Sequence, residues 1–327
     1  PIYSIEEDWH KELKVQAFTP LWSPSERDSF SKERVGISIS DVPGEGFSDH
    51  HIHPDHLVRL AQDLARHLLA RSKTLLYGGD LRPGGFTEFI LDEARILKDR
   101  LGETEPHVEN HLAWPLYVSD PEMTAWIARY HQVMKTVECE IPDDVADDLD
   151  KGYFLPPNTP RNSFIWSRCL TEMREKSITS STARICAGGK LTGYNGKMPG
   201  VLEEIVFTIN AQKPIFLLGA FGGVVGDVCM LLLTSDTPET LTETWQITHN
   251  AGYSDLQEIA RSNGHGCDYE EITESLKNIT IYDLASRCGL SEIEYRRLMK
   301  SPFVDECVYL ILKGLKGNQH GLNTTKR

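Results

Sequence analysis

An arginine, a pair of glycines and two adjacent acids form the most chemically suggestive part of the sequence. Arg174 lies upstream of an apolar run that ends at Gly188 and Gly189, and Glu203 and Glu204 open a predicted helix further on. Arginine can clamp a phosphate bidentately, glycine lets main-chain amides approach an anion, and a carboxylate can hold a ribose or activate water. Glutamate is also favoured in a first helical turn for stability alone, so both interpretations of the two acids stay open.

Glycine recurs at the ends of the predicted strands. In a parallel sheet the carboxyl ends of the strands share one edge, and the helices that follow offer free N–H groups there. The repetition predicts an anion-binding crevice at this edge. The candidate ligand-binding residues are Ser40, Gly44, Gly46, Gly78, Gly79, Asp80, Arg82, Gly188, Gly189, Lys190, Tyr194, Gly200, Glu203, Gly219, Gly222 and Gly223. Asp80 and Arg82 also suit a turn around Pro83, and Tyr194 is a loop side chain that could stack on a base.

The elements that must position these residues alternate between apolar runs and amphipathic stretches, which is typical of α/β proteins. The predicted strands or extended runs are 35–40, 74–77, 112–118, 132–139, 183–187 and 214–218. The predicted helices include 57–69, 87–97, 162–177 and 203–210. We therefore predict a Rossmann-like α/β fold, with a doubly wound, mostly parallel sheet, helices on both faces and a C-terminal α-helical extension.

The chain divides into segments of different character. We predict an N-terminal extension at 1–34, a Rossmann-like domain at 35–234 with an acidic, proline-bearing insertion at about 140–160, and a helical region at 235–327. Within the helical region, Ser291 and Glu294 have the spacing of a capping box, and Gly314 is expected to end a helix over 304–313.

Composition excludes several classes of partner. Acidic residues outnumber basic ones by 48 to 34, which gives a net charge of -14. Such a chain repels phosphate polymers and anionic lipid, so we expect neither a nucleic acid polymer nor a membrane as partner. The seven cysteines are scattered and never spaced as C-x-x-C, which predicts a cytoplasmic protein without a disulfide framework or a zinc ribbon.

A histidine-rich run offers a competing chemistry. His50, His51, His53 and His56 stand close together among aspartates, a spacing that could hold zinc or manganese. The run lies in a predicted loop and no partner cluster appears elsewhere, so we favour a solvated loop. We predict no metal and no cofactor.

The central motif resembles a known family. The order Met173-Arg174-Glu175-Lys176, then a strand, two glycines and Pro199-Gly200-Val201-Leu202-Glu203-Glu204, is similar to the lysine decarboxylase-like LOG (lonely guy) group. More broadly it resembles the SLOG superfamily of Rossmann-like domains that bind or process nucleotides. The family's phosphate loop is Pro-Gly-Gly-x-Gly-Thr-x-x-Glu, preceded by Arg-Lys. This chain departs from it at Ala187, Val201 and Glu175, and the insertion Lys190–Pro199 splits the loop.

The resemblance implies a nucleotide-derived small molecule as ligand. By it, Arg174 and Glu204 would match the catalytic arginine and glutamate of an enzyme that cleaves the N-glycosidic bond of a nucleotide. Arg174 would clamp the phosphate and Glu204 would hold the ribose, stabilise oxocarbenium character or activate water. The alternative is a non-catalytic sensor of NAD-derived or cyclic nucleotides in a bacterial defence system. By analogy with related folds, we expect a homo-oligomer.

Overall fold

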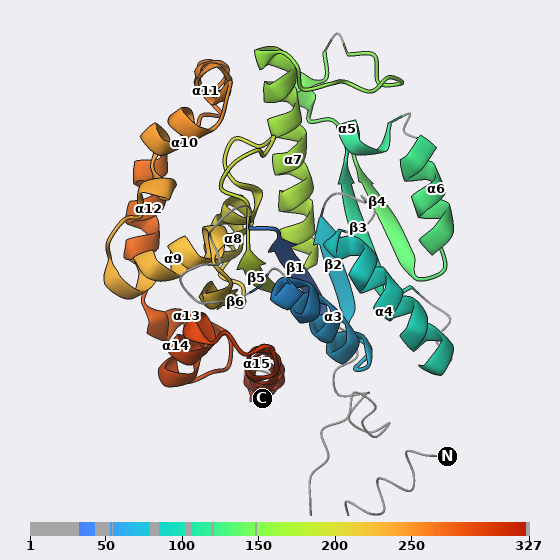
Figure 1. Ribbon diagram of the computed structural model, residues 1–327, viewed down its shortest axis with the longest axis vertical. Coiled ribbons are helices and arrows are strands. Elements are labelled where there is room, and N and C mark those ends of the chain that lie inside the picture. Colours follow the sequence, from blue (N-terminus) through green and yellow to red (C-terminus); the bar gives the residue numbers. More distant parts are fainter. Residues whose placement is uncertain are drawn as a thin grey trace, which may run out of the picture.

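A parallel sheet lies at the centre of the computed structural model (Figure 1), which describes residues 33–42, 53, 55–78, 85–101, 106–118, 121–147 and 149–324. Within these residues it has six strands in the order β4-β3-β2-β1-β5-β6. The strands are β1 Arg34–Ser40, β2 Thr74–Gly78, β3 Val108–Ala113, β4 Met134–Cys139, β5 Ala183–Gly188 and β6 Ile215–Leu218. The first four strands extend the sheet in one direction, and β5 and β6 then extend it in the other. The direction of winding therefore reverses between β1 and β5.

Helices cover both faces of the sheet, as predicted. Those of the α/β part are α3 Asp55–Leu69, α4 Phe86–Leu101, α5 Trp114–Tyr117, α6 Pro121–Tyr130, α7 Pro160–Ser180, α8 Gly200–Asn210 and α9 Gly223–Thr234. Helix α7 crosses β1 to β4, and α8 packs beside it against β1, β5 and β6. The Rossmann-like α/β prediction is confirmed.

In α3, the apolar residues whose helical spacing predicted the helix are the residues that are buried. Leu57, Leu60, Ala61, Leu64 and Leu68 all lie in the core, so one stripe of the helix faces inward. The long α7 begins in the same local manner. Thr159 caps it by accepting a hydrogen bond from Asn162 N at 3.2 Å, and Pro160 occupies the first turn.

The third strand differs from its prediction. A strand was expected at 112–118, but β3 covers Val108–Ala113 and the chain turns at once into the short helix α5. Pro115 lies in the first turn of α5. Proline has no N–H to give to a ladder and favours a helix start, which explains why the apolar run leaves the sheet there.

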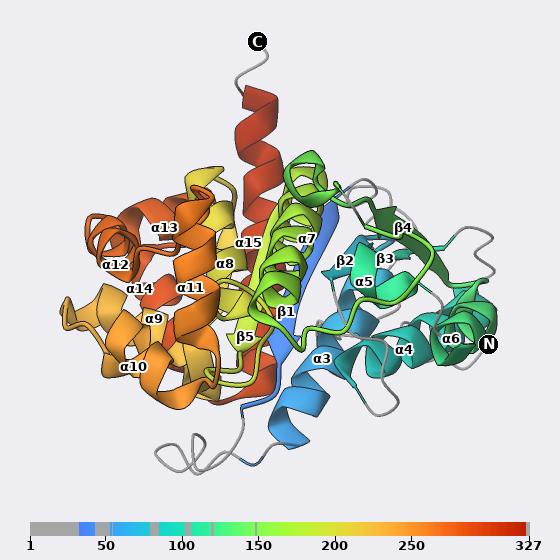
Figure 2. The same cartoon turned by 90° about the horizontal axis from the view of Figure 1, so that it is seen from above.

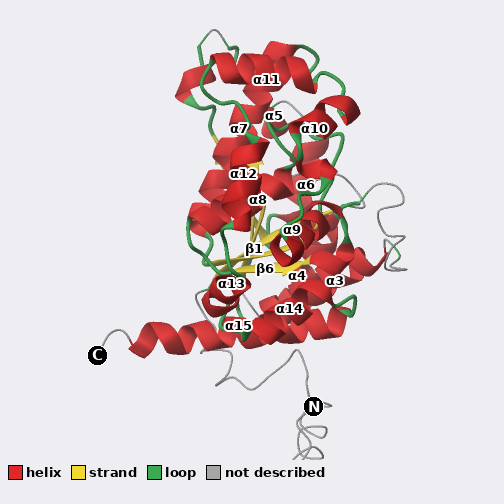
Figure 3. Cartoon of the chain, turned by 90° about the vertical axis from the view of Figure 1, so that its left-hand side faces the viewer, coloured by secondary structure: helices red, strands yellow, loops and turns green. Residues whose placement is uncertain are grey.

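Beyond Thr234 the described chain is helical, as expected. It comprises α10 Glu243–His249, α11 Tyr253–Ser262, α12 Tyr269–Lys277, α13 Ile281–Arg287, α14 Glu292–Lys300 and α15 Val304–Thr324. Helices α10 to α14 stand beside the sheet (Figure 2), whereas α15 packs against α3. Helices α11 and α15 lie at opposite ends of the molecule (Figure 3). The capping box of Ser291 and Glu294 is confirmed at the start of α14.

Gly314 does not end a helix but lies inside α15. A Cβ at this position would come within 2.4 Å of Cys288 O and 2.8 Å of the Phe216 ring. The glycine therefore serves the close approach of α15 to its neighbours, and the prediction of a helix end there was wrong.

Among the described residues between β4 and α7, where an insertion was predicted, the chain is irregular apart from a short 3-10 helix, Asp143–Val145. Arg168 of α7 fixes it through two hydrogen bonds to Asp144, at 2.7 and 3.0 Å. All seven cysteines are free thiols. None of the described helices combines the length and the apolar character needed to span a bilayer.

Candidate functional site

The carboxyl ends of β1 and β5 meet where the winding of the sheet reverses. Ser40 pairs with Gly188 in the register of the two strands. Gly189 N donates to Ser40 O at 3.1 Å, and Lys190 N donates to Ser40 Oγ at 3.2 Å. We call these four residues the switch-point edge. Ligands of open α/β sheets bind in the crevice outside such an edge, because the helices diverge on either side of it.

Two helices begin beside the switch-point edge without a side-chain cap. Helix α8 starts after Pro199 and α9 starts after Gly222, and neither residue supplies a capping hydrogen bond. Gly222 and Gly223 have φ of 69° and 60°, and a Cβ at Gly223 would lie 2.4 Å from Gly189 O. Glycine at these positions thus lets α9 start against the edge. Val224 N, in the first turn of α9, already donates to Gly189 O at 3.1 Å. The positive end of each helix dipole and first-turn amides without a partner favour an anion.

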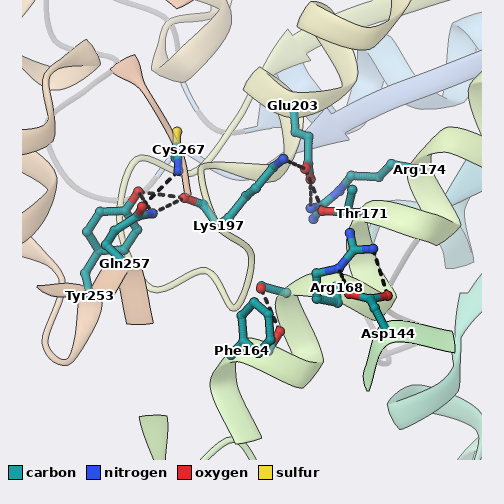
Figure 4. Close-up of polar contacts among 11 residues, drawn as sticks. Asp144, Phe164, Arg168, Thr171, Arg174, Lys197, Glu203, Tyr253, Gln257 and Cys267 are labelled. Carbon is teal, nitrogen blue, oxygen red and sulfur yellow. Dashed lines mark hydrogen bonds and ion pairs between the residues drawn. The ribbon is translucent and has the colours of Figure 1, made fainter. Parts of the chain in front are cut away.

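The predicted arginine belongs to a buried polar cluster between α7 and α8 (Figure 4). Arg174 Nη1 lies 2.5 Å from Glu203 Oε2, Thr171 Oγ1 donates to Glu203 Oε1 at 2.7 Å, and Lys197 Nζ lies 3.7 Å from the same oxygen. Glu203 is fully buried. We call Thr171, Arg174, Lys197 and Glu203 the charged cluster. The acid that Arg174 contacts is therefore Glu203.

The predicted glutamate has a different partner. Glu204 Oε1 lies 3.2 Å from Arg184 Nη1. Arg184 is 0% exposed and also donates to Ser38 Oγ and Ser177 Oγ at 2.8 and 2.9 Å. Its guanidinium lies across Gly36, where a Cβ would come within 2.8 Å of Arg184 Cζ. The structure thus does not pair Arg174 with Glu204. Their assignment as catalytic residues stays a prediction.

Glu204 nevertheless reaches the carboxyl end of β2. A Cβ at Gly78, the last residue of β2, would lie 3.8 Å from Glu204 Oε1. His111 pairs with Gly78 in the register of β2 and β3, so its side chain points to the same face. It is 2% exposed, and neither ring nitrogen has a hydrogen-bond partner. Burial lowers the pKa of His111 to about 4, which keeps the ring neutral at neutral pH.

Tyr194 lies in the stretch that splits the glycine motif, which we call the split loop (residues 190–199). Its hydroxyl donates to Gln246 Oε1 of α10 at 2.5 Å, so its polar end is occupied by the helical region. Gly193 N likewise donates to Asn250 Oδ1 at 2.9 Å. Burial raises the pKa of Tyr194 well above its usual value, and the phenol therefore remains a hydrogen-bond donor.

The remaining predicted residues fall into three groups. Lys190 is partly exposed beside Ser40, and Gly200 opens α8 with Arg174 Nη2 against it. Gly219 packs tightly, because a Cβ there would lie 2.6 Å from Cys229 Cβ. Five others lie outside the described residues: Gly44, Gly46, Gly79, Asp80 and Arg82.

The histidine run falls mostly outside the described residues too. Its described members include His53 and His56, which are exposed and contact each other through His53 N and His56 Nδ1 at 3.1 Å. Among the described residues, no group of three or more His, Cys, Asp or Glu side chains could hold a metal ion.

Sequence reasoning missed Arg184, Thr171 and Lys197. One signal was available for Arg184, since an arginine in an otherwise apolar strand must find buried partners. Ser38 on the neighbouring strand and Ser177 on the preceding helix supply them. Nothing in the spacing of Thr171 and Lys197 distinguishes them from ordinary helix and loop residues.

Comparisons with known proteins found one family model and solved structures that match the chain. A family model described as SLOG cluster2 matches residues 29–298, so the match crosses residue 234, where the sequence predicts a domain boundary. Among solved structures, the X-ray structure of TM1055, a structural genomics target, matches with 14% identity and a TM-score of 0.31. That match covers 70% of this chain and 99% of TM1055. No curated protein matches the sequence.

Proposed function

Because the chain belongs to the SLOG cluster2 family, we propose that it binds a nucleotide-derived ligand at the switch-point edge. One observation carries the proposal: two uncapped helices, α8 and α9, begin where the winding of the sheet reverses. Their amides suit a phosphate group, and a phosphate is the part that all nucleotides share.

Nearby cations support the same placement. Arg174 lies against the first residue of α8, since a Cβ at Gly200 would come within 2.5 Å of its Nη2. Lys190 lies partly exposed beside Ser40. The net charge of -14 would repel a free nucleotide from most of the surface. A small ligand therefore needs these local cations and amides for its phosphate.

Hydrolysis of the N-glycosidic bond is a second candidate function, favoured by the position of Glu204. Its carboxylate lies near Gly78, at the carboxyl end of β2. Negative charge beside C1′ would stabilise the positive charge that develops on the sugar as the base departs. Water would then add to C1′ and the base would leave with a proton. One observation opposes hydrolysis: the Glu204 carboxylate is already paired with Arg184. Such a pairing is compatible with a sensor that binds the nucleotide without cleaving it.

The binding proposal is tested by titration calorimetry of the protein with AMP, ADP-ribose and NAD. Ser40→Asp adds a negative charge at the edge while keeping an acceptor for Lys190 N, so we expect affinity to fall at least about tenfold. Thr182→Asp is the matched control, because Thr182 accepts from Arg34 N at the opposite end of the sheet. Equal affinities in the two variants would refute the placement. Absence of binding by the unaltered protein would refute the function.

Catalysis is tested separately by chromatography for free base after incubation with the same three nucleotides. Release of adenine or nicotinamide would support hydrolysis, and Glu204→Gln should then lower the rate at least about a hundredfold. A ligand recovered intact after binding would identify a sensor.

A further inference from the structure

Two side chains of the helical region hydrogen-bond to a main-chain carbonyl of the split loop. Tyr253 OH donates to Lys197 O at 2.6 Å, and Gln257 Nε2 donates to the same oxygen at 2.9 Å (Figure 4). Gln257 Nε2 also lies 2.7 Å from Tyr253 OH, and Gln257 Oε1 accepts from Cys267 N at 2.9 Å. Both gripping side chains are almost fully buried on α11. Lys197 O is therefore held by two donors whose own positions are fixed.

The same residue is held from the other side by its ammonium group. Lys197 Nζ lies 3.7 Å from Glu203, which is paired with Arg174. Lys197 thus joins the helical region, through its carbonyl, to the charged cluster, through its side chain. Any shift of α11 would move Lys197 relative to Glu203 in the first turn of α8.

The split loop has no regular structure of its own to hold it in place. It leaves the switch-point edge at Gly189 and ends at Pro199, where α8 begins. Between these points it is anchored to α10 and the residues after it through Tyr194 and Gly193. An irregular segment takes its conformation from such anchors. The path of the split loop from the switch-point edge to the start of α8 is therefore held in part by contacts that the helical region supplies.

We propose that Tyr253 and Gln257 are positioning residues for the ligand site, so that ligand affinity depends on the docking of the helical region onto the split loop. This inference rests on the proposed function. The range of the family match, which includes both residues, supports treating the helical region as part of the same unit. By reciprocity, a ligand at the switch-point edge must in turn stabilise the docked helical region.

The competing explanation is that these contacts only stabilise the fold, and the chain offers a matched control. Tyr295 of α14 is fully buried, and its hydroxyl donates to Ile215 O at 2.6 Å. Like Tyr253, it joins the helical region to a main-chain carbonyl of the α/β part. Ile215 is the first residue of β6, at the end of the strand away from the switch-point edge. The variants Tyr253→Phe and Tyr295→Phe therefore remove the same kind of bond at two places.

The test measures ADP-ribose affinity by calorimetry and stability by urea unfolding for the two variants. We expect both to lose a similar amount of stability, and only Tyr253→Phe to weaken ADP-ribose binding, by about five- to tenfold. Hydrogen exchange supplies a second readout. ADP-ribose should slow amide exchange in α11 of the unaltered protein, and this protection should shrink in Tyr253→Phe.

Equal affinities of Tyr253→Phe and Tyr295→Phe for ADP-ribose would overturn the inference and leave the proposed function standing. If the unaltered protein binds none of AMP, ADP-ribose and NAD, the proposed function is refuted and the inference falls with it. Should Tyr253→Phe fail to fold, Tyr194→Phe removes a different contact between the helical region and the split loop, the hydrogen bond to Gln246 Oε1, while keeping the ring, and the same loss of affinity is expected.

Discussion

Replacing Glu204 by glutamine should destabilise the protein, whatever its effect on a ligand. Arg184 is 0% exposed, and Glu204 is the acid that it contacts, at 3.2 Å. The amide keeps the shape of the side chain but removes its charge. A buried guanidinium is then left with the hydroxyls of Ser38 and Ser177. Breaking a buried ion pair from one side costs about 3–5 kcal/mol, and the remaining amide oxygen places our expectation near the lower end, at about 3 kcal/mol.

Urea unfolding measures this loss, and a double-mutant cycle assigns it to the pair. Arg184→Met removes the cation with a side chain of similar length. In the double variant Arg184→Met/Glu204→Gln, no buried charge is left unpaired. We expect a coupling free energy of about 2 kcal/mol between the two positions.

A loss below about 1 kcal/mol in Glu204→Gln, or additive effects in the cycle, would refute the buried-pair argument. The result also bears on any assay of catalysis. A slower rate in Glu204→Gln identifies a catalytic residue only at a temperature where the variant is shown to be folded.

Three further predictions concern stability. Because burial lowers the pKa of His111 from 6.5 to about 4, the unfolded state takes up a proton more readily, so stability is full above pH 6.5 and falls by about 3 kcal/mol towards pH 4. His111→Phe should flatten this dependence in urea unfolding at pH 7 and pH 4.5. Gly314→Ala should lower stability by about 2 kcal/mol although alanine favours helices, because its Cβ would collide with Cys288 O. Thr159→Ala should cost about 1 kcal/mol in thermal unfolding, and Thr159→Ser should restore most of it.

Much of the fold could be predicted because local patterns carry it. The helix α3 follows from leucines and alanines at helical spacing, and β1, β2 and β5 from short apolar runs that end at or near the sheet edge. The third strand was misplaced because the apolar run continues through Trp114–Tyr117. Periodicity cannot separate a buried strand from the buried helical turn that follows it.

The candidate site could be predicted only in outline. Recurring glycines indicated the edge of the sheet, since the close approach at Gly223 needs a residue without a side chain. The partners of Arg174 and Glu204 could not be read from the sequence, because adjacent residues on a helix point in different directions. The hydrogen bond from Tyr253 to Lys197 O could not be predicted from the sequence either, because every residue has a main-chain carbonyl.

Because the guanidinium of Arg184 lies across Gly36, two positions 148 residues apart in the sequence are expected to evolve together. Among descendants of a common ancestor, a substitution at 36 that adds a methyl group would displace the guanidinium from its serine partners, so it should be tolerated best where the arginine has been replaced by something shorter. An alignment of related chains should therefore show these two columns changing together, with the serine at 38 freed to vary wherever the arginine is lost.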